Sequence, residues 1–327
     1  DRSAQRWGPA TADQSRGAMR KRTSSSVRGV ALLLVLWAVA ILSFAVIWVA
    51  DLVNLELATK SADARGMAAR QIALSGVALG LHPQVTRDDV ELLNREIRPG
   101  ETMRVRIRGE GARFNINQLL AEQDRMVLKN LFVLWGLDSD AADILIDRLT
   151  DWVDDDIGRQ LNGAEQAEYE AAGILDAPAN QPFRSVDEMG RVLGMEELAK
   201  IKPDWRNAFT IFGDGKIDVN EAGSDVLQVA TGLTPEMTED IIRVRLGPDG
   251  EEQTEDDLRF ESVGQLDGWL TASSYPAGQA AARLTTESVV KRIDSRGIVE
   301  ECEWLISVVA ESGEGGQSSR YLLWEEK

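Results

Sequence analysis

Cysteine and histidine are almost absent from this sequence of 327 residues. It contains one cysteine, Cys302, and one histidine, His82. A single cysteine excludes an intrachain disulfide. The scarcity of both residues excludes a zinc site built from a cluster of them, and it places any Ser-His-Asp triad at His82. A domain of this length folds without disulfides, so the lack of cysteine pairs leaves an extracytoplasmic location open.

Basic residues are also scarce relative to acidic ones. The chain has 36 Lys and Arg against 54 Asp and Glu, which gives a net charge of −18. Such a balance repels nucleic acid and anionic membrane surfaces. Segment 1–29 is the exception, because it carries seven basic residues against Asp1 and Asp13. Basic residues thus precede the apolar segment that follows, and acidic residues come after it. This asymmetry predicts that the N-terminus lies in the cytoplasm and that the acidic body lies on the other side of the membrane.

One long apolar run occupies the N-terminal region. From Val30 to Ala50, 21 residues carry no charge, and a helix of that length spans about 31 Å, the thickness of a bilayer core. The run is longer than a signal-peptide core and ends without a clear small-x-small cleavage site, which favours an uncleaved anchor. Apolar residues recur until Pro83, so we expect one helix from Val30 to about His82, roughly 80 Å long.

The body reads as strands near both ends with a helical stretch between them. "ETMRVRIRG" alternates apolar and basic residues, as a half-buried strand does. The C-terminal segment reads as further strands, with a hairpin turn at "GEGG". A sheet domain with a helical insertion is therefore expected.

The helical stretch contains a helix-hairpin-helix pattern. Gly232 permits a tight turn, Thr234 caps the second helix and Pro235 occupies its first position. "FRSVDEM" and "FESVGQL" look like repeated pieces of the same build. Such hairpins bind phosphate in DNA-repair proteins, but acidic residues flank this one, which favours protein packing.

An acidic cluster lies within the same stretch. "DWVDDD" places four aspartates within six residues, and "GAEQAEY" adds glutamates nearby. Clustered like charges destabilise a fold unless a cation or strong donors offset them, and calcium takes six to eight oxygen ligands. A solvated acidic helix end is the alternative. A second acidic stretch, "TIFGDGKIDVNE", holds Thr210 and Phe212 where an EF-hand loop needs its first and third ligands, so Asp214, Asp218 and Glu221 would form at most a looser site.

A basic leader ending at Gly29 before a long apolar helix resembles the type IV prepilins and the pseudopilins of type II secretion. Those families carry Glu at position five of the mature chain, where this sequence has Leu34. The K-type minor pseudopilins characteristically lack that acid. The order of the remaining motifs over residues 28–327 is similar to that family: "RGVALLLVLW", "FNINQL", "LTDWVDDD", "GAEQAEY", "ANQPFRSVDEM" and "IDVNEA".

The resemblance implies an α+β, type IV pilin-like fold with a helical insertion of helix-hairpin-helix or SAM-like units. The expected parts are a leader, 1–29, cleaved after Gly29 by a prepilin peptidase; a helix and first strands, 30–118; the insertion, 119–285; and the last strands, 286–327. Met19 is an alternative start of this leader. Val30 would become the methylated N-terminus. The body would lie in the periplasm, held by a single pass through the inner membrane.

The resemblance also implies a role, partners and a metal. The role is that of a minor pseudopilin at the pseudopilus tip, assembled with I-type and J-type minor pseudopilins and the major pseudopilin. Calcium is implied in the insertion, and its ligands carried onto this chain are Asp151, Asp154, Asp156 and Glu165. Leu34 would avoid burying an unpaired carboxylate in a subunit with no neighbour above it. No enzyme and no nucleic-acid partner are expected. The alternatives are a signal-anchored periplasmic helix-hairpin-helix protein that binds DNA or another protein, and a metal-dependent hydrolase.

Overall fold

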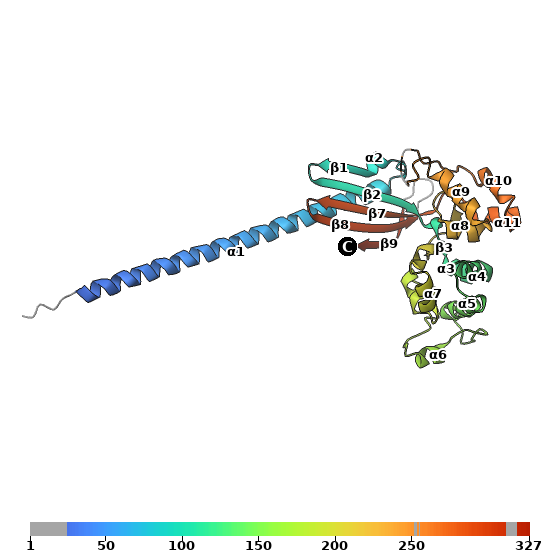
Figure 1. Cartoon of the computed structure of the whole chain (residues 1–327), viewed down its shortest axis with the longest axis horizontal. Coiled ribbons are helices and arrows are strands. Elements are labelled where there is room, and N and C mark those ends of the chain that lie inside the picture. Colours follow the sequence, from blue (N-terminus) through green and yellow to red (C-terminus); the bar gives the residue numbers. More distant parts are fainter. Residues whose placement is uncertain (1–24, 252–253, 255, 312–318) are drawn as a thin grey trace, which may run out of the picture. The chain divides into compact units, whose positions relative to one another are not determined.

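Figure 1 shows the computed structural model of this chain, which describes residues 25–251, 254, 256–311 and 319–327. Contacts divide the chain into two units, residues 1–61 and 62–327. Helix α1 (Ser25–Gly80) contains no proline. Its residues 25–61, which we call its outer part, belong to the first unit, and its residues 62–80, its inner part, belong to the second. The leader residues 1–24 lie outside the described part.

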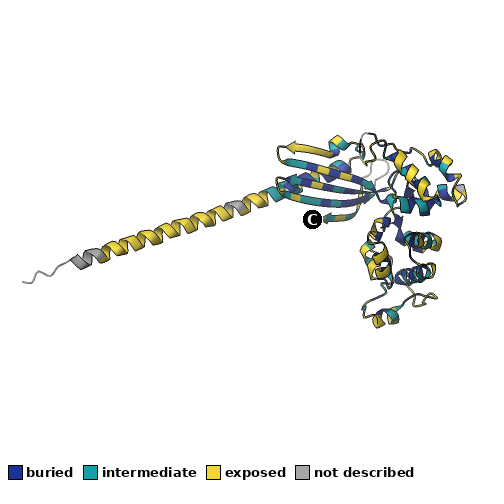
Figure 2. Ribbon diagram, viewed as in Figure 1, coloured by how far each residue is buried: buried dark blue, intermediate teal, exposed yellow. Residues whose placement is uncertain are grey.

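The outer part of α1 is apolar and exposed. Val30, Leu34, Phe44 and Trp48 all have more than half of their surface accessible, and Figure 2 shows exposed residues along most of this segment. Among the described helices, α1 is the one long and apolar enough to cross a membrane. The prediction of a single helix that ends near His82 is confirmed, since α1 ends at Gly80.

The second unit is built on a five-stranded antiparallel sheet with strand order β1-β2-β7-β8-β9. Its strands are β1 (Asn94–Arg98), β2 (Glu101–Gly109), β7 (Val290–Val299), β8 (Cys302–Glu311) and β9 (Arg320–Glu326). A short helix, α2 (Val90–Leu93), precedes β1. β8 and β9 pair as the predicted hairpin, although residues 312–318 between them lie outside the described part.

One face of this sheet packs on the inner part of α1. Met103, Val105 and Ile107 alternate along β2 and are buried with Ala69 and Ile72 of the helix. The helix approaches closely, because a Cβ added at Gly297 of β7 would overlap the backbone of Ala69. The predicted α+β class is confirmed, and the alternation in β2 leaves its arginines on the opposite face.

The insertion leaves the sheet after β2 and returns at β7. It contains η1 (Glu110–Ala112), β3 (Phe114–Asn115), α3 (Ile116–Ala121), α4 (Arg125–Leu134), α5 (Ser139–Val153), α6 (Gln166–Ala171), η2 (Val186–Arg191), α7 (Met195–Ile201), η3 (Trp205–Ala208), β4 (Phe209–Thr210), β5 (Ile217–Asp218), α8 (Ser224–Thr231), α9 (Pro235–Arg245), η4 (Val263–Leu266), α10 (Asp267–Leu270), α11 (Ala277–Ala282) and β6 (Leu284–Thr285). It therefore begins earlier than the predicted boundary at residue 118, because β3 pairs with β4 inside the insertion and not with the large sheet.

Two similar modules make up the insertion. Each is closed by a two-stranded parallel pair, β3 with β4 and β5 with β6, and each contains a helix hairpin, α4–α5 and α8–α9. In each, an asparagine side chain brackets the backbone of a buried phenylalanine. The Asn117 side chain accepts the N–H of Phe183 at 2.8 Å and donates to its C=O at 2.9 Å. Asn220 does the same for Phe260 at 2.8 and 3.0 Å.

The predicted hairpin at residues 232–235 is confirmed. Gly232 has φ +70°, and the Thr234 hydroxyl accepts the N–H of Met237. The hairpin of the first module, which turns at Gly136 with φ +101°, was not predicted, although "WGLD" has the same glycine-leucine-cap order as "TGLT". The first module differs by a long segment, residues 154–182, between its hairpin and Phe183.

Candidate cation site

Helix α5 carries the first carboxylates of the site. Its start is capped by the Asp138 side chain, which accepts the N–H of Asp140 at 2.9 Å. Apolar residues at helical spacing bury one face in the core of the insertion: Ala142, Leu145, Ile146, Leu149 and Trp152. The helix ends at Val153, because Asp154 is extended with φ −71° and ψ 159°. Asp154 therefore begins the loop and leaves the helix.

Aromatic packing fixes the position of the second segment of the site. The fully buried Trp152 packs edge-on against Tyr169 of α6 with ring centroids 5.3 Å apart, and it stacks on Phe183 at 6.3 Å. Glu165 lies directly before α6, and its backbone N–H donates to the carboxylate of Glu168 at 3.0 Å. This packing holds the start of α6 beside the end of α5.

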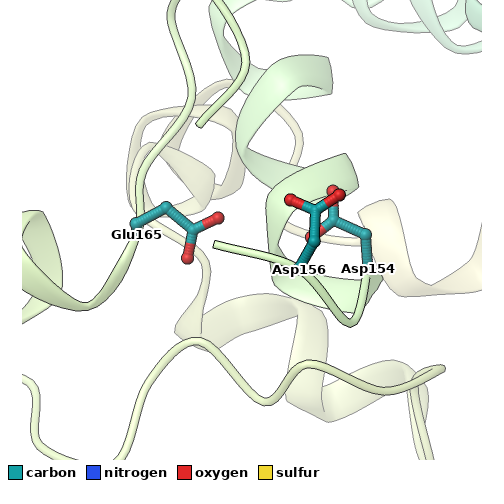
Figure 3. A group of neighbouring side chains, drawn as sticks. All are labelled: Asp154, Asp156 and Glu165. Carbon is teal, nitrogen blue, oxygen red and sulfur yellow. The ribbon is translucent and has the colours of Figure 1, made fainter. Parts of the chain in front are cut away.

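Three carboxylates converge where the two segments meet. Asp154, Asp156 and Glu165 each offer one oxygen, and these oxygens all lie within 4.8 Å of one another. Figure 3 shows the two aspartates together on one side and the Glu165 carboxylate directed toward them from the other. Among the described residues, Oδ1 of Asp154 and Oε1 of Glu165 are buried and have no hydrogen-bond partner. Two acceptors in this cluster are thus left without a donor.

The electrostatic environment disfavours the charged forms of these groups. Burial, followed by repulsion from Asp156 and Asp151, raises the pKa of Asp154 to about 6. Burial is also the main cause that raises the pKa of Glu165, with repulsion from Asp151 and Asp154 added to it. A bound cation would relieve both causes, since it supplies opposite charge and replaces the lost water.

Asp151 departs from its predicted place. It is fully buried, and the structure does not include it in the three-carboxylate group. Its two oxygens accept the backbone N–H of Gln160 at 3.1 and 3.2 Å. One turn earlier on α5, Asp147 accepts the N–H of Asn162 at 3.0 Å. These two aspartates therefore hold the loop against the helix. Asp147 was not singled out from the sequence, although its spacing of four residues from Asp151 places both on one face of a helix.

The second acidic stretch does not form a cluster. Asp218 is buried and accepts the Ser288 hydroxyl at 2.9 Å. Glu221 pairs with Arg87 at 3.3 Å and accepts the N–H of Gly109 at 2.6 Å, while Asp214 accepts the N–H of Lys216. Each of these carboxylates thus has a separate partner, so the looser site considered from the sequence is not formed among them.

The donor set at Asp154, Asp156 and Glu165 fits a hard cation. All three ligands are carboxylate oxygens, which calcium prefers and which zinc sites use less than nitrogen and sulfur. The two unpartnered acceptors are the observation that supports a cation, because a buried oxygen without a donor is destabilising unless something positive contacts it. The remaining ligands of a calcium ion would be water or backbone carbonyls.

Comparison with known proteins places this site in a recognised domain. Residues 112–203 match the family model "Type II secretion system (T2SS), protein K". A chain in the crystal structure of the GspK–GspI–GspJ complex from the type 2 secretion system of enterotoxigenic Escherichia coli has the same fold. The TM-score is 0.58 at 19% identity, and the match covers 84% of this chain and 99% of that one. No curated protein matches the sequence.

The family match and the fold agree with the resemblance that the sequence motifs carry. The matched segment contains most of the first module and the three-carboxylate cluster, and the shared fold covers 84% of this chain. Residues 112–203 of this chain are therefore similar to protein K of the type II secretion system, and the chain shares the fold of the similar solved chain.

Proposed function

We propose that this protein is a minor pseudopilin that caps the pseudopilus of a type II secretion system and supports export of folded proteins. The observation that supports this role most directly is the architecture around the protein K domain. A long apolar helix packs on a small antiparallel sheet, and the bulky insertion interrupts that sheet between β2 and β7. Such an insertion would obstruct a subunit stacked above it, which suits the last position of a filament.

The outer part of α1 would serve as a membrane anchor before assembly and as a packing surface after it. Its exposed apolar residues suit both a bilayer and neighbouring helices. The basic leader before it predicts a cytoplasmic N-terminus in the inner membrane, with the body in the periplasm. Mass spectrometry of the mature chain tests the processing step. Cleavage after Gly29 with a methylated Val30 is expected, and an intact leader in cells with an active prepilin peptidase would contradict it.

The partners that we propose are I-type and J-type minor pseudopilins, together with the major pseudopilin. The similar solved chain comes from a complex that contains GspI and GspJ. Leu34 suits the tip, because a subunit with no neighbour above it has no terminal amine to pair with an acid at that position. Replacing Leu34 with Glu should lower the recovery of I-type and J-type partners on purification and reduce export. Unchanged recovery and export would refute this role of Leu34.

We also propose that calcium binds Asp154, Asp156 and Glu165. Bound there, the ion would neutralise the cluster and tie the loop after α5 to the start of α6. Metal analysis of the purified chain after dialysis against micromolar calcium should find the ion in the wild type. Its retention by a variant in which Asp154 and Glu165 are replaced by Asn and Gln would overturn the assignment of these ligands.

A further inference from the structure

The sheet face turned away from α1 carries arginines on two adjacent strands. Along β2, the alternation that buries Met103, Val105 and Ile107 places three arginines on the other side. The antiparallel register sets Arg104 opposite Arg296, Arg106 opposite Asp294 and Arg108 opposite Arg292. We call the five arginines of these pairs the arginine face: Arg104, Arg106, Arg108, Arg292 and Arg296.

The arginines of this face repel one another. Two of the three cross-strand pairs, Arg104 with Arg296 and Arg108 with Arg292, set like charges directly opposite each other, which destabilises a sheet. A half-buried strand such as β2 requires polar residues on its exposed face, but it does not require that they all carry positive charge. In a chain with a net charge of −18, five arginines on one face are not a consequence of composition.

The acids on this side of the sheet neutralise the face only in part. Asp294 pairs with Arg108 at 2.5 Å. Glu303 pairs with Arg296 at 3.0 Å, but both side chains are about half exposed, so this pair is weak. Arg104 is exposed and has no ion-pair partner among the residues that the structure describes. Arg292 pairs with the buried Glu110 at 2.7 Å, so among the described residues positive charge is left unpaired on this face at Arg104.

The arginine face continues into a cavity of about 660 Å³ between the sheet and the insertion. Arg108 and Arg292 line it from the sheet, while Arg113, Arg184 and Arg206 line it from the insertion. Nε of Arg108 is buried and has no acceptor among the described residues. Burial lowers the pKa of the Arg113 guanidinium, and nearby Arg292 and Arg108 lower it further. Arg113 already pairs with Glu110 and Arg206 with Asp187. Seven arginines and five acidic residues line the cavity, so its wall keeps a surplus of guanidinium groups, and Nε of Arg108 could donate to an added anion.

We infer that the arginine face and this cavity form a docking surface for an extended acidic segment of another protein. Guanidinium groups bind carboxylates through paired hydrogen bonds. Alternate residues of a strand are about 6.8 Å apart, so a row of three arginines matches an extended segment with an acid at every second position. A nucleic acid or an anionic membrane is a poorer fit, because each presents a long-range negative field to a strongly acidic protein.

Fluorescence anisotropy with a labelled (Glu-Thr)5 peptide tests this inference on the full chain in non-ionic detergent at low salt. The peptide should bind, more tightly than an isomer with its five glutamates in one block, and binding should weaken as salt is added. Replacing Arg104 and Arg106 with Gln should weaken binding roughly fivefold. The matched control replaces Arg95, which lies opposite Met103 on the other face, and the exposed Arg243 of α9, and should leave binding within about twofold.

Three results would overturn the inference. They are no binding of the alternating peptide, equal weakening by the two double variants, and tighter binding of a ten-residue oligothymidylate or of anionic lipid vesicles than of the peptide. Circular dichroism confirms the fold of each variant. If the Arg104 and Arg106 double variant does not fold, Arg296→Gln alone should weaken peptide binding more than Arg95→Gln alone, and equal effects would count against the docking surface.

Discussion

The buried carboxylate of Glu110 offers a sharp test of how the insertion is held to the sheet. Glu110 directly follows β2 and is completely buried. One of its oxygens accepts Nε of Arg292 at 2.7 Å and lies 3.5 Å from Arg113. The other accepts the Thr210 hydroxyl from β4 of the insertion. One carboxylate thus connects β7, the start of the insertion and the end of its first module.

Replacing Glu110 with Gln should be strongly destabilising. The amide N–H would face either the Thr210 hydroxyl or the Arg292 guanidinium, and both of these groups are hydrogen-bond donors to Glu110. The change would also leave Arg113 and Arg292, each only 19% exposed, without their counter-ion. Breaking a buried pair in this way costs about 3–5 kcal/mol. The same change at Glu303, whose pair with Arg296 is about half exposed, should cost about 1 kcal/mol or less.

Urea unfolding followed by tryptophan fluorescence measures both variants against the wild type in non-ionic detergent. The nine tryptophans include the buried Trp152 and Trp205 of the insertion. Adding Arg292→Met to the Glu110→Gln variant should restore part of the lost free energy of unfolding, because the second substitution removes one buried charge that has no counter-ion. A Glu110→Gln cost no larger than that of Glu303→Gln would refute the idea that this buried network secures the insertion.

Three further predictions concern the cation site. Calcium at 100 times its dissociation constant should raise the free energy of unfolding by about 2.7 kcal/mol in thermal or urea scans, and a variant with Asp154→Asn and Glu165→Gln should show no such response. Without calcium, the pKa of Asp154 near 6 exceeds its ordinary value of 3.8, so the folded state takes up this proton first. Lowering the pH from about 7 to 5 should then add about 1 kcal/mol of stability or less through this group, after allowance for solvent screening, whereas calcium affinity should fall. A stability change of the same size in Asp154→Asn would contradict the assignment. A Cβ at Gly163 would overlap the carboxylate of Asp151, so Gly163→Ala should cost about 1–3 kcal/mol, whereas Gly268→Ala, with nothing within 4 Å of its added Cβ, should cost little; equal costs would show that Asp151 moves aside freely.

Much of the fold was predictable because it depends on neighbours in the sequence. The uncharged run from Val30 to Ala50 and the absence of proline up to Pro83 are sufficient to predict a long apolar helix. The alternation in β2 predicts a strand with one buried face, and Gly232, Thr234 and Pro235 predict a turn between helices. Each of these patterns acts through local backbone geometry and through which side of an element meets water.

The composition of the cation site was decided by the tertiary structure. Sequence proximity grouped Asp151 with Asp154 and Asp156, but helix α5 ends between them, so Asp151 faces Gln160 while Asp154 turns toward Glu165. Glu165 reaches the site because Trp152 packs on Tyr169. The pairing of β3 with β4 likewise joins Phe114 to Phe209, residues far apart in the chain. Composition and periodicity determine which elements form and which faces are apolar. The carboxylates that meet are determined by where packing ends a helix and by how a loop is held, and both of these depend on contacts between residues distant in sequence.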